Sequence, residues 1–103
     1  MSLFRFLFGH AVDDTIDTRD AHALVANGAV LVDARTPREF RASHAEGAIN
    51  LPLSELARAR DLLGSQSPIV VYCRSGARSA RAASMMRDMG FQQVHDLGSI
   101  ANW

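Results

Sequence analysis

The 103-residue chain contains no lysine, because all eleven of its basic residues are arginine. Mechanisms that need a lysine nucleophile or a Schiff base are therefore excluded within this chain. Its formal net charge is zero and its arginines form no basic stripe, which argues against general nucleic-acid binding. Its apolar runs are all far shorter than a membrane-spanning helix, so no membrane span is expected.

Cysteine occurs only once, at position 73. A single cysteine cannot form a disulfide within the chain, so nothing indicates an oxidising compartment and we expect a cytoplasmic protein. The four histidines lack metal-ligand spacing among themselves or with Cys73. We therefore expect no metal and no other cofactor. Any sulfur or oxygen added to the Cys73 sulfur must be removed by an external thiol or small molecule.

The composition is that of one globular domain, with 48% hydrophobic and 21% charged residues. We expect this domain to cover residues 14–103. Residues 1–13 form an apolar extension that includes Leu3-Phe4-Arg5-Phe6-Leu7-Phe8. This run is too short to span a bilayer. We expect it to pack against the domain or a partner, and contact with a membrane surface or a second copy is the alternative.

Apolar, β-branched segments alternate with segments of helical periodicity, which predicts an α/β fold with a mainly parallel sheet. The expected strands are 29–32, 47–50, 68–72 and 93–97, with a short edge strand opened by Ile16. The expected helices are 19–26 capped by Thr18, 36–40, 55–63 capped by Ser54, and 79–89 capped by Ser79. The strands 29–32 and 68–72 are apolar throughout, so helices should cover both faces of the sheet.

Cys73 lies where the apolar strand 68–72 gives way to a short loop, followed by the helix 79–89. Ligands of open α/β folds bind at this end of the strands, and a helix amino terminus favours negative charge. Arg74 and Arg78 lie in the same loop. We therefore expect an ionised, solvent-accessible thiolate instead of an inert buried cysteine.

Three parts of the chain together resemble single-domain rhodaneses. Residues 31–40 match the family pattern (V/I)-D-x-R-x-x-x-E-(F/Y), and residues 43–52 continue the match. Residues 71–79 resemble the active-site segment, and residues 94–103 resemble the closing segment. The resemblance implies a rhodanese-like fold, with a five-stranded, mainly parallel sheet and helices on both faces.

The chain departs from the family pattern at three scaffold positions. Ser43 and Ala45 replace a glycine and an isoleucine beside His44, and Ser99 replaces a glycine near the end. These changes affect local geometry and leave the expected chemistry unaltered.

The resemblance also implies that Cys73 cycles between thiol and persulfide inside a cradle of backbone N–H groups. The donor would be an anion such as thiosulfate, and the acceptor would be cyanide, a small thiol or a protein thiol. The implied roles are nucleophile for Cys73, donor binding for Arg74 and Arg78, and backbone contacts for Ser75, Gly76 and Ala77. For Arg78, pairing with a carboxylate beside the helix start is the structural alternative.

Three other functions fit parts of the pattern. A persulfide carrier acting between protein partners would use the same cysteine. A cysteine-dependent phosphatase or arsenate reductase needs Cys-x5-Arg, whereas Arg78 follows Cys73 one residue too early. A non-catalytic module of this fold would be expected to lack the cysteine. We therefore expect a thiosulfate sulfurtransferase.

Other polar residues are expected to serve the scaffold. Asp33 and Arg35 should form an ion pair, with an Arg35–Glu39 contact as the alternative. His44 is expected to be a hydrogen-bonded loop histidine and not a general base, and Trp103 to cover the end of the core. The buried face of the helix 79–89 is expected to contain Ala82, Met85, Met86 and Met89.

Overall fold

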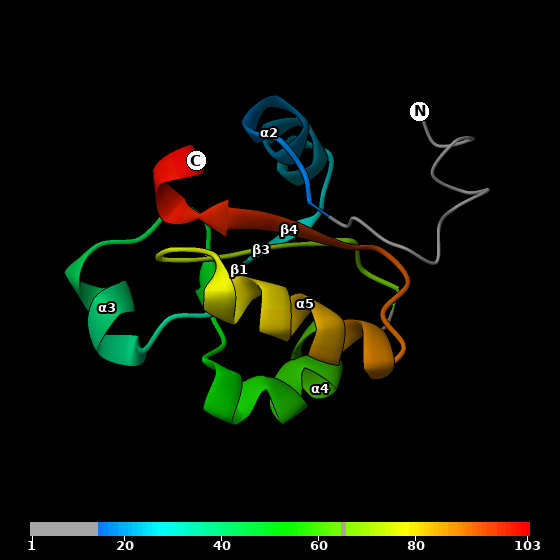
Figure 1. Cartoon of the computed structure of the whole chain (residues 1–103). Coiled ribbons are helices and arrows are strands. Elements are labelled where there is room, and N and C mark those ends of the chain that lie inside the picture. The colour runs from blue at the N-terminus through cyan, green and yellow to red at the C-terminus, as the bar shows by residue number, and fades with distance from the viewer. Residues whose placement is uncertain (1–14, 65) are drawn as a thin grey trace.

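The computed structural model describes residues 15–64 and 66–103, so the expected apolar extension at 1–13 lies outside the described residues. Strands and helices alternate along the chain, as the sequence predicts (Figure 1). The elements are α2 (Thr18–Ala26), β1 (Val30–Asp33), α3 (Pro37–Ala42), β2 (Ile49–Asn50), the 3-10 helix η1 (Leu53–Arg58), α4 (Ala59–Leu63), β3 (Ile69–Cys73), α5 (Ala77–Asp88), β4 (Val94–Ser99) and the 3-10 helix η2 (Ile100–Asn102).

The sheet is parallel and has the strand order β2-β1-β3-β4. The prediction of five strands is wrong for the described residues, which contain four. The expected edge strand is reduced to a single bridge between Thr15 and Asp96, next to a hydrogen bond from the Ile16 N–H to the Asp96 carbonyl. Pairing stops there because the chain turns into α2 at Asp17, whose side chain caps that helix.

One irregularity interrupts the pairing of β3 with β4. Val71 lies opposite Asp96, but the next residue, Tyr72, lies opposite Gly98. Leu97 is therefore an extra residue, which makes a β-bulge. Beyond the bulge, the last residue of β3 lies opposite the last residue of β4.

Two hydrophobic cores lie on the two faces of the sheet. Side chains of β3 alternate between them, with Ile69 and Val71 on one face and Val70 and Tyr72 on the other. Helices α5 and α4 cover the first face, and α2 with the carboxyl-terminal turn covers the second (Figure 1). The alternation directs Cys73, at the end of β3, to the face that α5 covers.

Several helices begin at other residues, or have other caps, than the sequence predicts. The cap of α2 is Asp17 and not Thr18. The expected helix 55–63 is the 3-10 helix η1 followed by α4, and Ser54 is not its cap. Its first turn closes early because the Glu55 N–H donates to the carbonyl of Pro52. The loop glycine before α5 allows that helix to begin at Ala77, two residues earlier than expected.

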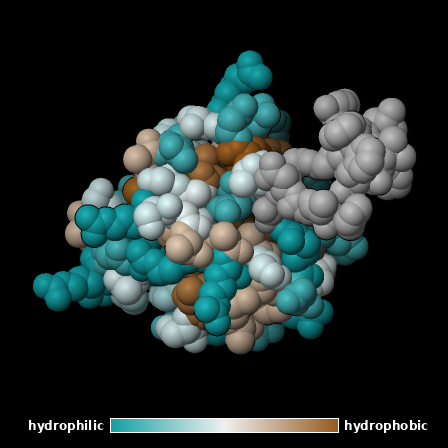
Figure 2. All heavy atoms as spheres, viewed as in Figure 1, coloured by the Kyte–Doolittle hydropathy of each residue, from teal (hydrophilic) through white to brown (hydrophobic). Residues whose placement is uncertain are grey.

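Among residues 15–64 and 66–103, few large apolar side chains are exposed. The face drawn in Figure 2 is mostly hydrophilic, with small hydrophobic areas between polar ones. Met85, expected in the buried face of α5, is 37% exposed, whereas Ala82 and Met86 are buried and Met89 packs against the core. No helix within 15–64 or 66–103 is long and apolar enough to cross a membrane.

Candidate active site

The loop after β3 turns its backbone toward the sulfur of Cys73. The Gly76 N–H donates a hydrogen bond to Sγ at 3.0 Å. Gly76 has φ of 107°, a conformation that residues with a side chain rarely adopt. A Cβ at this position would lie 3.9 Å from the Cα of Gly98, which is an ordinary contact. The glycine is therefore needed for its dihedral angle and not for close approach.

Several donors stabilise the ionised form of the Cys73 thiol. Burial alone would raise its pKa, but the hydroxyl of Ser79 and the backbone N–H groups of Ser79, Gly76 and Ser75 act in the opposite direction. Together these hydrogen bonds outweigh burial and hold the pKa of the thiol below its ordinary value. The loop therefore favours the thiolate, which is the nucleophilic form.

The expected solvent accessibility of this thiol is wrong for the conformation described. Cys73 is only 1% exposed. The loop that donates the hydrogen bonds also covers the sulfur. This cover consists of residues that themselves face solvent, because Arg74, Ser75 and Ala77 are exposed. A sulfur donor therefore reaches Sγ only when part of this loop moves.

Ser79 has a different place from the one expected of a helix cap. Because α5 begins at Ala77 after the N-cap Gly76, Ser79 lies inside the first turn and is fully buried. Its hydroxyl donates to the Gly76 carbonyl at 3.1 Å, and Ser79 helps to lower the pKa of the Cys73 thiol. The sequence does not reveal this arrangement, because it predicts a helix that begins two residues later, at Ser79.

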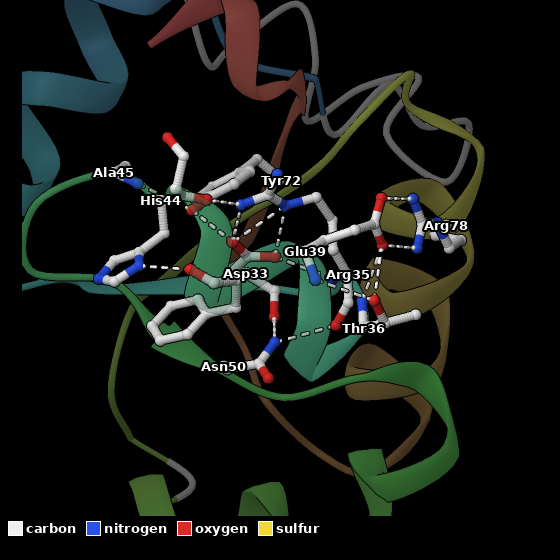
Figure 3. A network of polar contacts seen from close by, with 11 residues as sticks. Asp33, Arg35, Thr36, Glu39, His44, Ala45, Asn50, Tyr72 and Arg78 are labelled. Atoms are coloured by element: carbon white, nitrogen blue, oxygen red, sulfur yellow. Dashed lines mark hydrogen bonds and ion pairs between the residues drawn. The ribbon is translucent and has the colours of Figure 1, made fainter.

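Arg78 forms an ion pair with Glu39 of α3 (Figure 3). Its two terminal nitrogens donate to the two carboxylate oxygens, at 2.7 and 3.0 Å. Hydrogen bonds from Arg78 and then from Thr36 lower the pKa of Glu39 to about 2. The carboxylate pairing considered for Arg78 is confirmed, and donor binding by Arg78 stays a prediction.

Arg74 differs from Arg78 in its surroundings. It is exposed and forms no ion pair with any residue of 15–64 or 66–103. The charge of Arg78 is largely neutralised by Glu39, so Arg74 supplies the uncompensated positive charge of the loop. A dianionic donor approaching a thiolate requires such a charge.

A buried polar network fixes the neighbouring loop, between β1 and α3 (Figure 3). Asp33 and Arg35 form the expected ion pair, with a shortest contact of 2.7 Å and side chains 0% and 8% exposed. The Tyr72 hydroxyl also donates to Asp33, at 2.6 Å, and accepts from the N–H of Ala45. The alternative Arg35 partner, Glu39, binds Arg78 and Thr36 instead.

The network extends to the segment that leads into β2. Arg35 donates to the carbonyl of Ser43, and Asn50 donates to the carbonyls of Asp33 and Arg35. His44 is exposed, contacts the Phe40 carbonyl through Nδ1 at 2.7 Å and stacks on the Phe40 ring. It is therefore the hydrogen-bonded loop histidine that the sequence predicts.

Other features of the described residues lie apart from Cys73. A groove of about 540 Å³ runs beside α2, and neither Cys73 nor its loop lines it. Within the described residues, no cluster of three His, Cys, Asp or Glu side chains is arranged to hold a metal ion. Trp103, as expected, packs against the core on the α2 face, where it stacks on His22.

Comparison with known proteins agrees with this geometry. A family model described as a rhodanese-like domain matches residues 14–103. The chain belongs to the rhodanese family. Thiosulfate sulfurtransferase 16, chloroplastic, from Arabidopsis thaliana is 34% identical to this rhodanese domain over 105 residues, covering 89% of the chain and 88% of that protein.

Two further similarities support the same assignment. An uncharacterized protein of Bacillus subtilis, YqhL, is 37% identical over 76 residues, which are 73% of this rhodanese domain and 60% of that protein. Among solved structures, a human single-domain sulfurtransferase, TSTD1, is 25% identical with a TM-score of 0.77, covering 87% of this chain and 94% of that one. The family and the rhodanese-like fold expected from the sequence are therefore confirmed.

Proposed function

We propose that this rhodanese domain is a sulfurtransferase that carries sulfane sulfur on Cys73. The thiolate attacks the outer sulfur of an anionic donor such as thiosulfate. A bond forms between Sγ and that sulfur, and sulfite leaves with the electron pair of the broken S–S bond. A thiolate and a thiosulfate dianion thus become a persulfide anion and a sulfite dianion, and no oxidant is needed.

The observation that carries this proposal is the hydrogen bond that the Gly76 N–H donates to the Cys73 sulfur. The Gly76 N–H lies 3.0 Å from Sγ, and the amides of Ser75 and Ser79 assist it. Such donors stabilise negative charge on a thiolate or a persulfide without a metal. Arg74 would offset the charge of the incoming donor, with Arg78 held beside the site by its carboxylate partner.

An acceptor completes the cycle by attacking the outer sulfur of the persulfide. Cyanide would leave as thiocyanate, and a thiolate would leave as a new persulfide, and in both cases Cys73 returns as the thiolate. A protein thiol fits the same step, so duty as a persulfide carrier between proteins is a variant of this proposal. We place the reaction in the cytoplasm, where reduced thiols are available as acceptors.

A cysteine-dependent phosphatase is less well supported. Its loop would need one more residue between Cys73 and the arginine. In addition, both terminal nitrogens of Arg78 donate to Glu39, so part of the hydrogen-bonding capacity of this arginine is already used within the protein. Hydrolysis of an aryl phosphate by the purified protein would favour the phosphatase.

The test is an intact-mass measurement after incubation with thiosulfate, followed by cyanide and a thiocyanate assay. We expect the mass to increase by one sulfur atom and cyanide to remove that atom with release of an equal amount of thiocyanate. Cys73→Ser is the matched control, because the chain has no other cysteine. The proposal fails if the wild-type protein gains no sulfur, or if the serine variant gains it as well.

A further inference from the structure

The β-bulge of β4 brings Ser99 beside the catalytic loop. With regular pairing, Gly98 would lie opposite Cys73. The extra residue at Leu97 advances β4 by one position, so that Ser99 lies opposite Cys73. The hydroxyl of Ser99 is therefore level with the first peptide of the loop, although the two segments are 25 residues apart.

The single proton of the Ser99 hydroxyl is donated to the carbonyl of Arg74, at 2.7 Å. The same oxygen accepts a hydrogen bond from the N–H of Ala101, at 3.0 Å. Ser99 thus connects the carboxyl-terminal turn to the loop that surrounds the sulfur.

The orientation of one carbonyl fixes the orientation of the next amide. The Arg74–Ser75 peptide is trans, and in a planar trans peptide the C=O and N–H bonds point in opposite directions. Because Ser99 holds the Arg74 carbonyl on the side of β4, the Ser75 N–H points to the other side. Interaction with that N–H is one of the causes that lower the pKa of the Cys73 thiol, and the N–H of the next residue, Gly76, lies 3.0 Å from Sγ.

We propose that Ser99 is a positioning residue for sulfur transfer, which orients the Arg74–Ser75 peptide so that the Ser75 N–H stabilises the charged Cys73 sulfur. The assignment rests on the sulfurtransferase proposal for its role in turnover. The effect of Ser99 on the ionisation of Cys73 does not depend on which molecule donates the sulfur. Without Ser99, this peptide can rotate and present its carbonyl oxygen to the sulfur, where two negative groups would repel.

Other charged groups near the thiol have to be kept constant in a test. Arg78 of α5 interacts with the charge of Cys73, and Glu39 of α3 neutralises much of that effect. Arg74 lies in the loop, and the carboxylate of Asp96 in β4 accepts from the N–H of Gly98. A neutral substitution at position 99 changes none of these groups.

The experiment is a pH titration of the ultraviolet absorbance of the thiolate in wild type, Ser99→Ala and Ser99→Thr. The single cysteine makes the signal specific, and burial with a hydrogen bond to Asp33 raises the pKa of the only tyrosine, Tyr72, to about 12. For Ser99→Ala we expect the midpoint to rise by roughly one pH unit, since a donor to a charged group is lost. Ser99→Thr, which keeps the hydroxyl, should titrate close to wild type.

Thr18→Ala is the matched control. The Thr18 hydroxyl donates to the carbonyl of Asn102, so its loss loosens the carboxyl-terminal turn without contacting the loop. We expect it to leave the thiol midpoint unchanged. The proposal is overturned if Ser99→Ala titrates as wild type does, or if Thr18→Ala shifts the midpoint as much. Failure of wild type to form a persulfide would overturn the sulfurtransferase proposal and leave the titration result intact.

Discussion

Two loops follow the carboxyl ends of the neighbouring strands β1 and β3, and their conformations are stabilised in different ways. The loop after β1 is fixed by charged side chains, with buried Asp33 bound to Arg35 and Tyr72. The loop after β3 is fixed mainly through its backbone, whose N–H groups bind the Cys73 sulfur. Side chains that hold structure are not available to a ligand. A loop held by its backbone can expose Arg74 to one.

The largest expected effect is on stability, in the loop after β1. Asp33→Asn keeps the volume of the side chain but leaves the buried guanidinium of Arg35 without a counter-charge. We expect a loss of about 3 to 5 kcal/mol in the free energy of unfolding, measured by urea denaturation. The exposed Glu55–Arg58 pair is the control, since Glu55→Gln should cost less than about 1 kcal/mol. Equal effects of the two substitutions would show that the buried pair does not hold the fold.

The second effect should appear in donor binding, in the loop after β3. Arg74→Ala removes the uncompensated charge, so we expect the KM for thiosulfate to rise by roughly tenfold with little change in stability. Arg78→Ala should change KM less and should lower stability, because it leaves Glu39 without its ion-pair partner. Steady-state kinetics of both variants decide between the arginines. A larger KM effect at Arg78 would mean that the paired arginine binds the donor.

The smallest effect is a pH dependence in the contact between α3 and α5. Arg78 lowers the pKa of Glu39 to about 2, from an ordinary value of 4.5. The pair therefore stabilises the fold fully above about pH 4.5, and this contribution is lost as the pH falls toward 2. Glu39→Gln should lower the free energy of unfolding by about 1 kcal/mol at neutral pH, and the difference should vanish in acid. A difference that is constant across this pH range would rule out the ion pair as its source.

Much of the fold follows from the sequence because apolar runs and helix periodicity are strong signals. The strands β1 and β3 lie within one residue of their expected positions. The fifth strand was overestimated because an apolar Ile16 does not reveal that the chain turns into a helix at Asp17. Helix starts were displaced where backbone geometry and not a side chain caps the first turn, as at Gly76.

The sequence predicts those parts of the site that lie within one short motif, but not the contacts between residues distant in sequence. The position of Cys73 and the Asp33–Arg35 pair both follow from short motifs. The contact of Glu39 with Arg78 joins residues 39 positions apart, so adjacency in sequence could not reveal it. The one signal for Ser99 in the sequence is its departure from the family pattern, which by itself indicates only a change in local geometry.

The bulge at Leu97 also bears on how this chemistry could be moved to another protein. Grafting the six residues from Cys73 to Arg78 onto a different parallel sheet would transfer the amides without the strand end that orients the first of them. A working transplant has to carry the tip of β4 as well, in its shifted alignment. Deleting a single residue from the tip of β4 would leave all six loop residues in place but would raise the pKa of the thiol and lower its reactivity.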